Sequence, residues 1–165
     1  MKKIALLLLF LAGCRGNEDQ PNEAAPVQPT AERQQAGAGL TTLTGLYEGG
    51  SAGRPNQLCV TEGEGDASHF GLVVWGANDH SCSGSGTVRR AGANLALAMA
   101  GDSSCTITAP ISGTTVTLPA TLPPGCAYYC GARAQLGGAS FSQRGSTKAD
   151  ALRAKDLVGD PLCEG

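Results

Sequence analysis

The sequence predicts a small, mainly β domain: an antiparallel meander, barrel or sandwich, cross-linked by disulfides and followed by a short C-terminal helix. Three observations support this class. Apolar residues alternate with small or polar residues in several short runs, turn residues recur roughly every 8 to 14 positions, and six cysteines follow the leader. Residues 41–165 have an ordinary length for one domain, and we expect them to form a single β-rich domain.

The clearest predicted strand covers residues 94–100, where Leu95, Leu97 and Met99 alternate with alanines between two turn signals. Strict alternation is typical of a half-buried strand. We expect this strand to form a hairpin with residues 87–90 around a turn at 91–92. The other predicted strands are, in chain order, 45–48, 57–60, 69–75, 105–111 and 114–118.

The C-terminal residues 146–159 contain helix formers instead of alternating residues. Ser146 or Thr147 can act as the N-cap, because Asp150 follows three or four positions later and can complete a capping box. We therefore expect a short helix here, linked to the rest of the domain through Cys163.

The first 13 residues have the form of a secretory signal: two lysines precede an apolar run that is shorter than the about 20 residues a membrane-spanning helix needs. The run ends in Leu-Ala-Gly-Cys at 11–14, which resembles the lipobox of small bacterial lipoproteins. The resemblance implies that the signal peptide 1–13 is removed and that Cys14 is lipidated, with enough acyl chains for a firm membrane anchor. Arg15 stands where the family's inner-membrane retention signal has Asp, which favours the outer membrane of the bacterial cell envelope.

Residues 14–40 differ in composition from the rest of the chain, since they are polar, rich in proline and nearly free of large apolar side chains. Such a segment cannot bury enough surface to offset the entropy lost on ordering. We expect it to be a disordered tether with an end-to-end distance of about 25–30 Å.

The six cysteines after the lipidated one are predicted to form three disulfides, because their number is even and the expected compartment is oxidising. They are Cys59, Cys82, Cys105, Cys126, Cys130 and Cys163. Fifteen connectivities are possible. Extending the predicted hairpin outward brings Cys82 near Cys105, and this is the pair we expect first. Cys126 and Cys130 can pair with each other only if residues 126–130 form a helical turn; otherwise each pairs elsewhere.

The remaining composition argues against several classes of function. The chain has a formal net charge of −2 at pH 7 and no basic stripe, so we expect no nucleic-acid partner. A zinc site would need two further ligands beside Cys126 and Cys130, and His69 and His80 lack suitably spaced partners. The sequence therefore predicts no metal, no cofactor and no catalytic residue.

The run 79–81 (Asp-His-Ser) is interpreted as a polar loop, since adjacent side chains on an extended chain point to opposite faces. Trp75 is expected in the core, and of the adjacent tyrosines 128 and 129 one is expected to pack and the other to be exposed.

One segment resembles a known family. Residues 130–145 are similar to a motif of the membrane-bound inhibitors of c-type lysozyme, which are small β-barrel lipoproteins of Gram-negative envelopes. The matching positions are Gly131, Ala132, Arg133, Gly137, Phe141 and Gly145. In that family a serine and a lysine contact the catalytic carboxylates of lysozyme; the corresponding positions here hold Cys130 and Arg144. The resemblance implies that Arg144 pairs with a carboxylate of the partner. We expect Arg133 to orient the loop from inside.

Taken together, these features predict a lipid-anchored cell-envelope protein that acts as a non-catalytic binding or structural module and is held at the membrane by its lipid. The alternative is an inhibitor of c-type lysozyme acting through residues 130–145, with lysozyme or another envelope protein as partner. A small envelope hydrolase is a third hypothesis, and the sequence offers no nucleophile with an adjacent base to support it.

Overall fold

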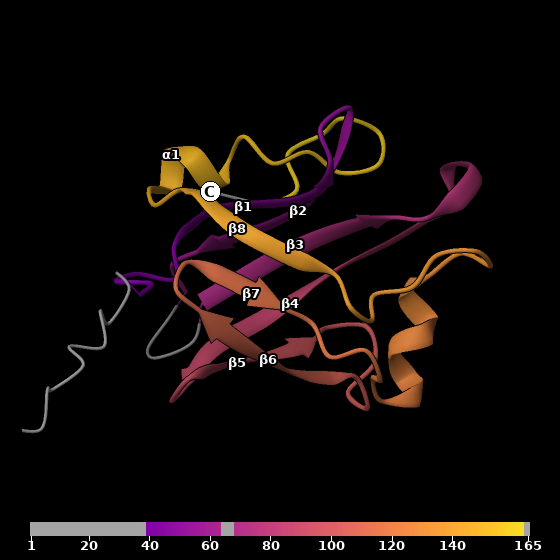
Figure 1. The fold of residues 1–165 in the computed structure, drawn as a ribbon, viewed down its shortest axis with the longest axis horizontal. Coiled ribbons are helices and arrows are strands. Elements are labelled where there is room, and N and C mark those ends of the chain that lie inside the picture. The colour runs from indigo at the N-terminus through magenta and orange to yellow at the C-terminus, as the bar shows by residue number, and fades with distance from the viewer. Residues whose placement is uncertain (1–38, 64–67, 164–165) are drawn as a thin grey trace, which may run out of the picture. The chain divides into compact units, whose positions relative to one another are not determined.

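The computed structural model of the protein describes residues 39–63 and 68–163. Within these ranges, eight antiparallel strands form one closed barrel in which β8 pairs with β1 (Figure 1). The mainly β class is confirmed, and of the architectures left open the barrel is the one found. The elements are β1 (Gly45–Ser51), β2 (Arg54–Thr61), β3 (Ser68–Trp75), the 3₁₀ turn η1 (Ala77–Asp79), β4 (Ser81–Ala91), β5 (Asn94–Met99), β6 (Thr106–Ser112), β7 (Thr115–Thr117), the 3₁₀ helix η2 (Pro124–Tyr129), β8 (Ser140–Gly145) and α1 (Lys148–Ala151).

Side chains from alternate positions of the strands fill the inside of the barrel. Leu95 and Leu97 are fully buried, whereas the alanines between and after them are more exposed, as the alternation predicted. The largest buried side chains are those of Tyr47, Phe70 and Phe141. An eight-stranded barrel has an interior just wide enough for such side chains.

The two ends of the barrel are formed by different connections (Figure 1). The end at which the described chain begins is called the proximal end here, and the β4–β5 and β6–β7 turns lie beside the start of the chain. There the Leu40 amide donates to the carbonyl of Gly113 (3.2 Å), and the Leu40 carbonyl accepts from the Arg90 guanidinium (2.8 Å). The opposite end is called the distal end, and it contains the β1–β2 and β3–β4 turns and the long β7–β8 connection, residues 118–139.

Leu40 is buried and belongs to the core, although the sequence placed it in the tether. Its apolar side chain reaches the core because both backbone groups of the residue are hydrogen-bonded to turns of the proximal end. The predicted signal peptide at 1–13, Cys14 and the part of the tether before residue 39 lie outside the described residues. Among the described residues, no helix has the length and apolar character needed to cross a membrane.

The C-terminal helix is present but much shorter than the predicted 146–159. Thr147 is the N-cap: its side chain accepts a hydrogen bond from the Asp150 amide, and the Asp150 carboxylate accepts from the Thr147 amide. After α1 the Asp156 side chain accepts from the amides of Val158 and Asp160 (2.9 and 2.8 Å). Such a local turn competes with helical hydrogen bonds, so the helix does not extend through residues 156–160 as predicted.

The segment after α1 covers part of the outer wall of the barrel. Leu46 and Cys59 are opposite each other on β1 and β2 and point outward, and they pack against Ala151, Ala154 and Cys163 in a second, smaller core. The Cys59–Cys163 disulfide holds this cover in place. The prediction that Cys163 links the C-terminal segment to the body is confirmed.

The six cysteines form three disulfides, as predicted, but the expected Cys82–Cys105 pair is wrong. The bonds are Cys59–Cys163, Cys82–Cys130 and Cys105–Cys126. The strand β4 extends beyond the last β5 pairing at Gly86 and Met99, so Cys82 has no β5 partner. Residue 130 lies beside Cys82 instead, in an isolated bridge, whereas the chain after Met99 turns away and Cys105 enters β6 on the other side of β5.

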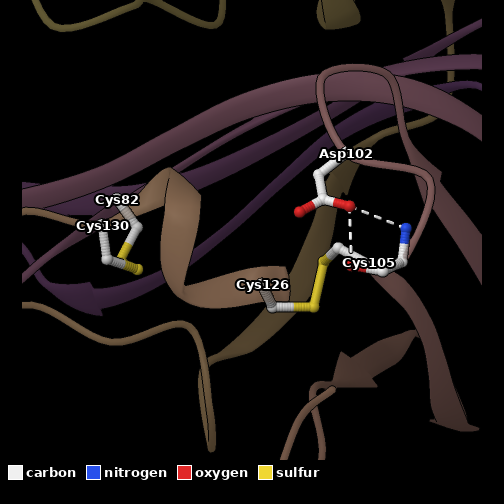
Figure 2. Close-up of a disulfide and its surroundings, with 6 residues drawn as sticks. Cys82, Asp102, Cys105, Cys126 and Cys130 are labelled. Carbon is white, nitrogen blue, oxygen red and sulfur yellow. Dashed lines mark hydrogen bonds between the residues drawn. A yellow bond between two sulfur atoms is a disulfide. The ribbon is translucent and has the colours of Figure 1, made fainter. Parts of the chain in front are cut away.

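Residues 126–129 do lie in the 3₁₀ helix η2, with Cys130 as its extended C-cap, yet the two cysteines are not bonded to each other. Figure 2 shows Cys126 and Cys130 near the two ends of η2, each joined to a cysteine of a different segment. Helical geometry was a necessary condition for their pairing and is not a sufficient one, because the two side chains point to different neighbours. Tyr129 packs on the core and Tyr128 is exposed, as expected for the tyrosine pair.

Candidate functional site

The two arginines singled out by the sequence lie near opposite ends of β8. Arg133 is in the β7–β8 connection at the distal end, and Arg144 is the fifth residue of β8, next to Gly145, which pairs with Leu46. Both side chains are exposed. The expectation that Arg133 orients the loop from inside is wrong, because its backbone lies on a turn at the surface of the barrel.

Several residues that carry the resemblance to lysozyme inhibitors have packing roles in this barrel. Phe141 is fully buried in the core. A Cβ at Gly137 would lie 2.4 Å from the carbonyl oxygen of Ala120, and one at Gly145 would lie 2.2 Å from the Asp150 carboxyl group. Cys130 has no thiol proton to donate, because it is oxidised in the bond to Cys82. Of the family's two contact positions, Arg144 alone keeps a group able to bind a carboxylate.

A different group of residues gathers at the distal end around Trp75, the last residue of β3. The Arg54 guanidinium lies over the Trp75 ring, 4.3 Å from its centroid, and forms an ion pair with Asp79. The Asn56 side-chain oxygen accepts a hydrogen bond from the Trp75 amide (2.8 Å). Trp75 is half-buried and lies outside the core, contrary to our expectation. The strand ends at this residue, so its ring lies at the rim rather than inside the barrel.

The turn that presents Asp79 has an uncommon backbone. Asn78 and Asp79 have φ values of 54° and 63°, in the left-handed region that asparagine and aspartate tolerate better than most residues. The Gly76 amide closes the loop by donating to the His80 carbonyl (2.7 Å). This geometry holds the Asp79 carboxylate within reach of Arg54. Of the predicted polar loop 79–81, Asp79 and His80 lie between β3 and β4 and Ser81 begins β4, and all three residues are exposed or half-exposed.

The turn that carries Arg133 is fixed on both sides. The Cys82–Cys130 disulfide anchors its start, the Gly131 amide donates to the Ser81 carbonyl (2.9 Å), and the Ala134 amide donates to the Gly131 carbonyl (3.1 Å). A Cβ at Gly76 would lie 2.5 Å from the Arg133 carbonyl oxygen, so the two loops touch through their backbones. The turn that carries Arg133 and the loop that follows Trp75 are therefore held against each other.

Between these two loops is an open, mostly polar groove of about 580 Å³, which we call the rim groove. The residues that line it include Asn56, Trp75, Arg133 and Gln135, together with Gly76 and Gly138. On the other side of the 132–137 segment is a second groove of about 470 Å³, lined mainly by small apolar residues, proline and leucine. A third, of about 560 Å³, lies on the outer wall beside the C-terminal cover.

The ionisable groups with shifted pKa values serve local structure. Burial raises the pKa of Tyr47 to about 12, against weaker opposing effects of the hydrogen bond to Gln143 and the charge of Arg90. Hydrogen bonds from the Ser104 side chain and amide lower the pKa of Asp102, which caps the turn into β6 (Figure 2). In the same way, hydrogen bonds from Thr147 lower the pKa of Asp150. These carboxylates stabilise turns, and Tyr47 belongs to the core.

Within residues 39–63 and 68–163, no three His, Cys, Asp or Glu side chains cluster in a way that could hold a metal ion. No protein-family model, curated protein or solved structure matches the chain. The basis for treating the rim groove as a binding site is therefore its geometry and not a related protein. Sequence reasoning found Arg133 but missed Arg54, Asn56 and Gln135, since their proximity to Trp75 depends on strand register and on a disulfide that the sequence did not identify.

Proposed function

We propose that this protein is a lipid-anchored, non-catalytic binding module of the bacterial cell envelope and that the distal end of its barrel is the binding face. The observation that carries this proposal is the end of the barrel at which the described part of the chain begins. Leu40 is hydrogen-bonded to turns of the proximal end, whereas Trp75 and Arg133 lie at the distal end. A lipid on Cys14 would hold the protein by a chain that joins the barrel on the side away from the rim groove.

Two further properties support this proposal. Three disulfides in a domain of this size are typical of an oxidising, extracytoplasmic compartment. The core is closed and apolar, and the grooves of the described residues lie on the outside, where a macromolecule or glycan can reach them. The tether predicted from the sequence, with a length of about 25–30 Å, would let the barrel approach such a ligand.

The anchor is tested with Cys14→Ser and Arg15→Asp variants expressed in a Gram-negative host. We expect the wild-type protein to partition with detergent, to carry the mass of the lipid and to fractionate with the outer membrane. Cys14→Ser removes the acceptor thiol and should give unlipidated precursor or soluble protein, while Arg15→Asp should keep the lipid and move the protein to the inner membrane. Lipid-modified protein from the Cys14→Ser gene would show that the proposed anchor is wrong.

A second candidate function is inhibition of c-type lysozyme. One observation favours it: Arg144 is exposed on β8, at the position where the resembling family has a lysine. A guanidinium facing the catalytic carboxylates would form charge-assisted hydrogen bonds, and truncating it would cost about 2–5 kcal/mol of binding. We expect Arg144→Ala to weaken inhibition at least about tenfold without lowering thermal stability. Unchanged lysozyme turnover in the presence of tens of micromolar wild-type domain would exclude this function.

A further inference from the structure

We propose that the rim groove binds an acidic carbohydrate, a glycan whose rings carry carboxylate groups. This inference rests on the proposed role as an envelope binding module and specifies the ligand class of its distal face. Arg133 would bind the carboxylate, the Trp75 ring would contact the sugar, and the amides of Asn56 and Gln135 would bind hydroxyl groups.

The charge of the groove favours an anion. Arg133 is the charged residue among those that line it, and it forms no ion pair with any described residue. Arg54 does not line the groove, but it lies on the Trp75 ring beside it as a second guanidinium, partly neutralised by Asp79. Both members of that pair are well exposed, with 48% and 80% of their side-chain surface accessible, so an incoming carboxylate can compete with Asp79. A guanidinium binds a carboxylate through two parallel hydrogen bonds, which gives both affinity and orientation.

The neutral residues of the groove favour a sugar over a simple ion. Trp75 is half-exposed, and the part of its ring that Arg54 does not cover would contact the C–H face of a pyranose. Asn56 uses its side-chain oxygen to hold the Trp75 amide and keeps its NH₂ group for other acceptors. Gln135 is exposed and offers both donors and an acceptor. A recessed polar wall with one aromatic side chain differs from the apolar, aromatic-rich centre of most protein interfaces.

The groove is formed before the ligand arrives, which reduces the entropy lost on binding. The Arg133 turn is fixed by the Cys82–Cys130 disulfide and by the contact between Gly76 and the Arg133 backbone. Trp75 is fixed by the Asn56 hydrogen bond and by Arg54 on its face. A groove volume of about 580 Å³ lies in the range of small-ligand sites.

The test uses Trp75 as its own reporter, because it is the single tryptophan of the chain. The purified, oxidised domain is titrated with hexagalacturonate, which has a carboxylate on each ring, and with neutral maltohexaose, while tryptophan fluorescence is recorded. We expect a saturable fluorescence change with hexagalacturonate that weakens with added salt, and at least about tenfold weaker binding of maltohexaose.

The variants separate the guanidinium from general charge. Arg133→Ala should weaken hexagalacturonate binding at least about tenfold, and Arg133→Lys should restore only part of it, because an ammonium lacks the planar fork. Arg89→Ala is the matched control, since Arg89 is an exposed arginine of β4 that pairs with Ala96 toward the proximal end, and it should bind like the wild type. Thermal melts of all three variants should match the wild type, as expected for exposed side chains.

No response to either sugar at millimolar concentration would overturn the proposal. So would equal binding of both sugars with no effect of Arg133→Ala, because the carboxylate would then play no part. Equal binding of a polyaspartate peptide would assign the groove to acidic proteins instead and would also overturn it. In each case the lipidation and outer-membrane results for Cys14→Ser and Arg15→Asp are unaffected, so failure of the ligand class is distinguishable from failure of the proposed function.

Discussion

Removing the Cys59–Cys163 disulfide is predicted to destabilise the domain more than removing Cys105–Cys126. The first bond joins residues 104 apart and the second joins residues 21 apart. The Cys82–Cys130 bond lies inside the larger loop and bypasses 48 of its residues, which leaves an effective loop of roughly 56. The chain-entropy relation then gives about 4 kcal/mol for Cys59–Cys163 and about 3 kcal/mol for Cys105–Cys126. All four side chains are buried, so the loss of packing is similar in the two cases.

The comparison is made with the double variants Cys59→Ala/Cys163→Ala and Cys105→Ala/Cys126→Ala under non-reducing conditions. Alanine avoids placing a hydroxyl group in an apolar site. The free energy of unfolding is measured by urea titration, followed by far-UV circular dichroism and by Trp75 fluorescence, with m-values compared because cross-links also change the denatured state. A larger loss for Cys105→Ala/Cys126→Ala would refute the loop-entropy reasoning. A loss below about 1 kcal/mol for Cys59→Ala/Cys163→Ala would refute it as well, and would show that the C-terminal cover adds little to the stability of the barrel.

Three other predictions follow from single features. The pKa of Tyr47 is about 12 in the folded protein, against 10.0 for the unfolded chain, so the folded state keeps a proton that the unfolded state releases and stability falls as pH rises from 10 to 12. The loss is about 1.4 kcal/mol at pH 11, and urea titrations at pH 9 and 11 should show it for the wild type but not for Tyr47→Phe. Alkylation of the denatured, unreduced mature protein should add no mass, because the six described cysteines are all oxidised; a labelled pair would contradict the disulfide assignment. Arg133→Ala should leave the melting temperature unchanged, since its side chain is exposed, and a clear decrease would show that it supports the loop after all.

The strands could be predicted because their signal is local. Alternation placed Leu95 and Leu97 on the buried face of β5 before any neighbour was known, and the same holds for Val116 on β7. The capping box of α1 was also visible, since Thr147 and Asp150 are three residues apart. The length of that helix was not visible, because the turn centred on Asp156 competes with it and helix propensity alone does not decide between them.

Disulfide connectivity could not be predicted because it depends on strand lengths. The Cys82–Cys105 hypothesis assumed that β4 and β5 end together, and a difference in their lengths moved Cys105 to the far side of β5. The site depended on this same information. Arg133 is near Trp75 only because Cys130 is bonded to Cys82, so a wrong connectivity also hid the groove.

The positions of the disulfides explain how a chain with few aromatic side chains can hold a rigid surface. Ladder hydrogen bonds fix the eight strands, but the β7–β8 connection, residues 118–139, has no strand of its own. Two of the three disulfides attach this connection to the barrel, through Cys126 and Cys130. The same connection supplies walls to both distal grooves. Reducing the Cys82–Cys130 bond would free the Arg133 turn while the ladder stays closed, so we expect reduction to impair binding at the rim groove before it unfolds the barrel.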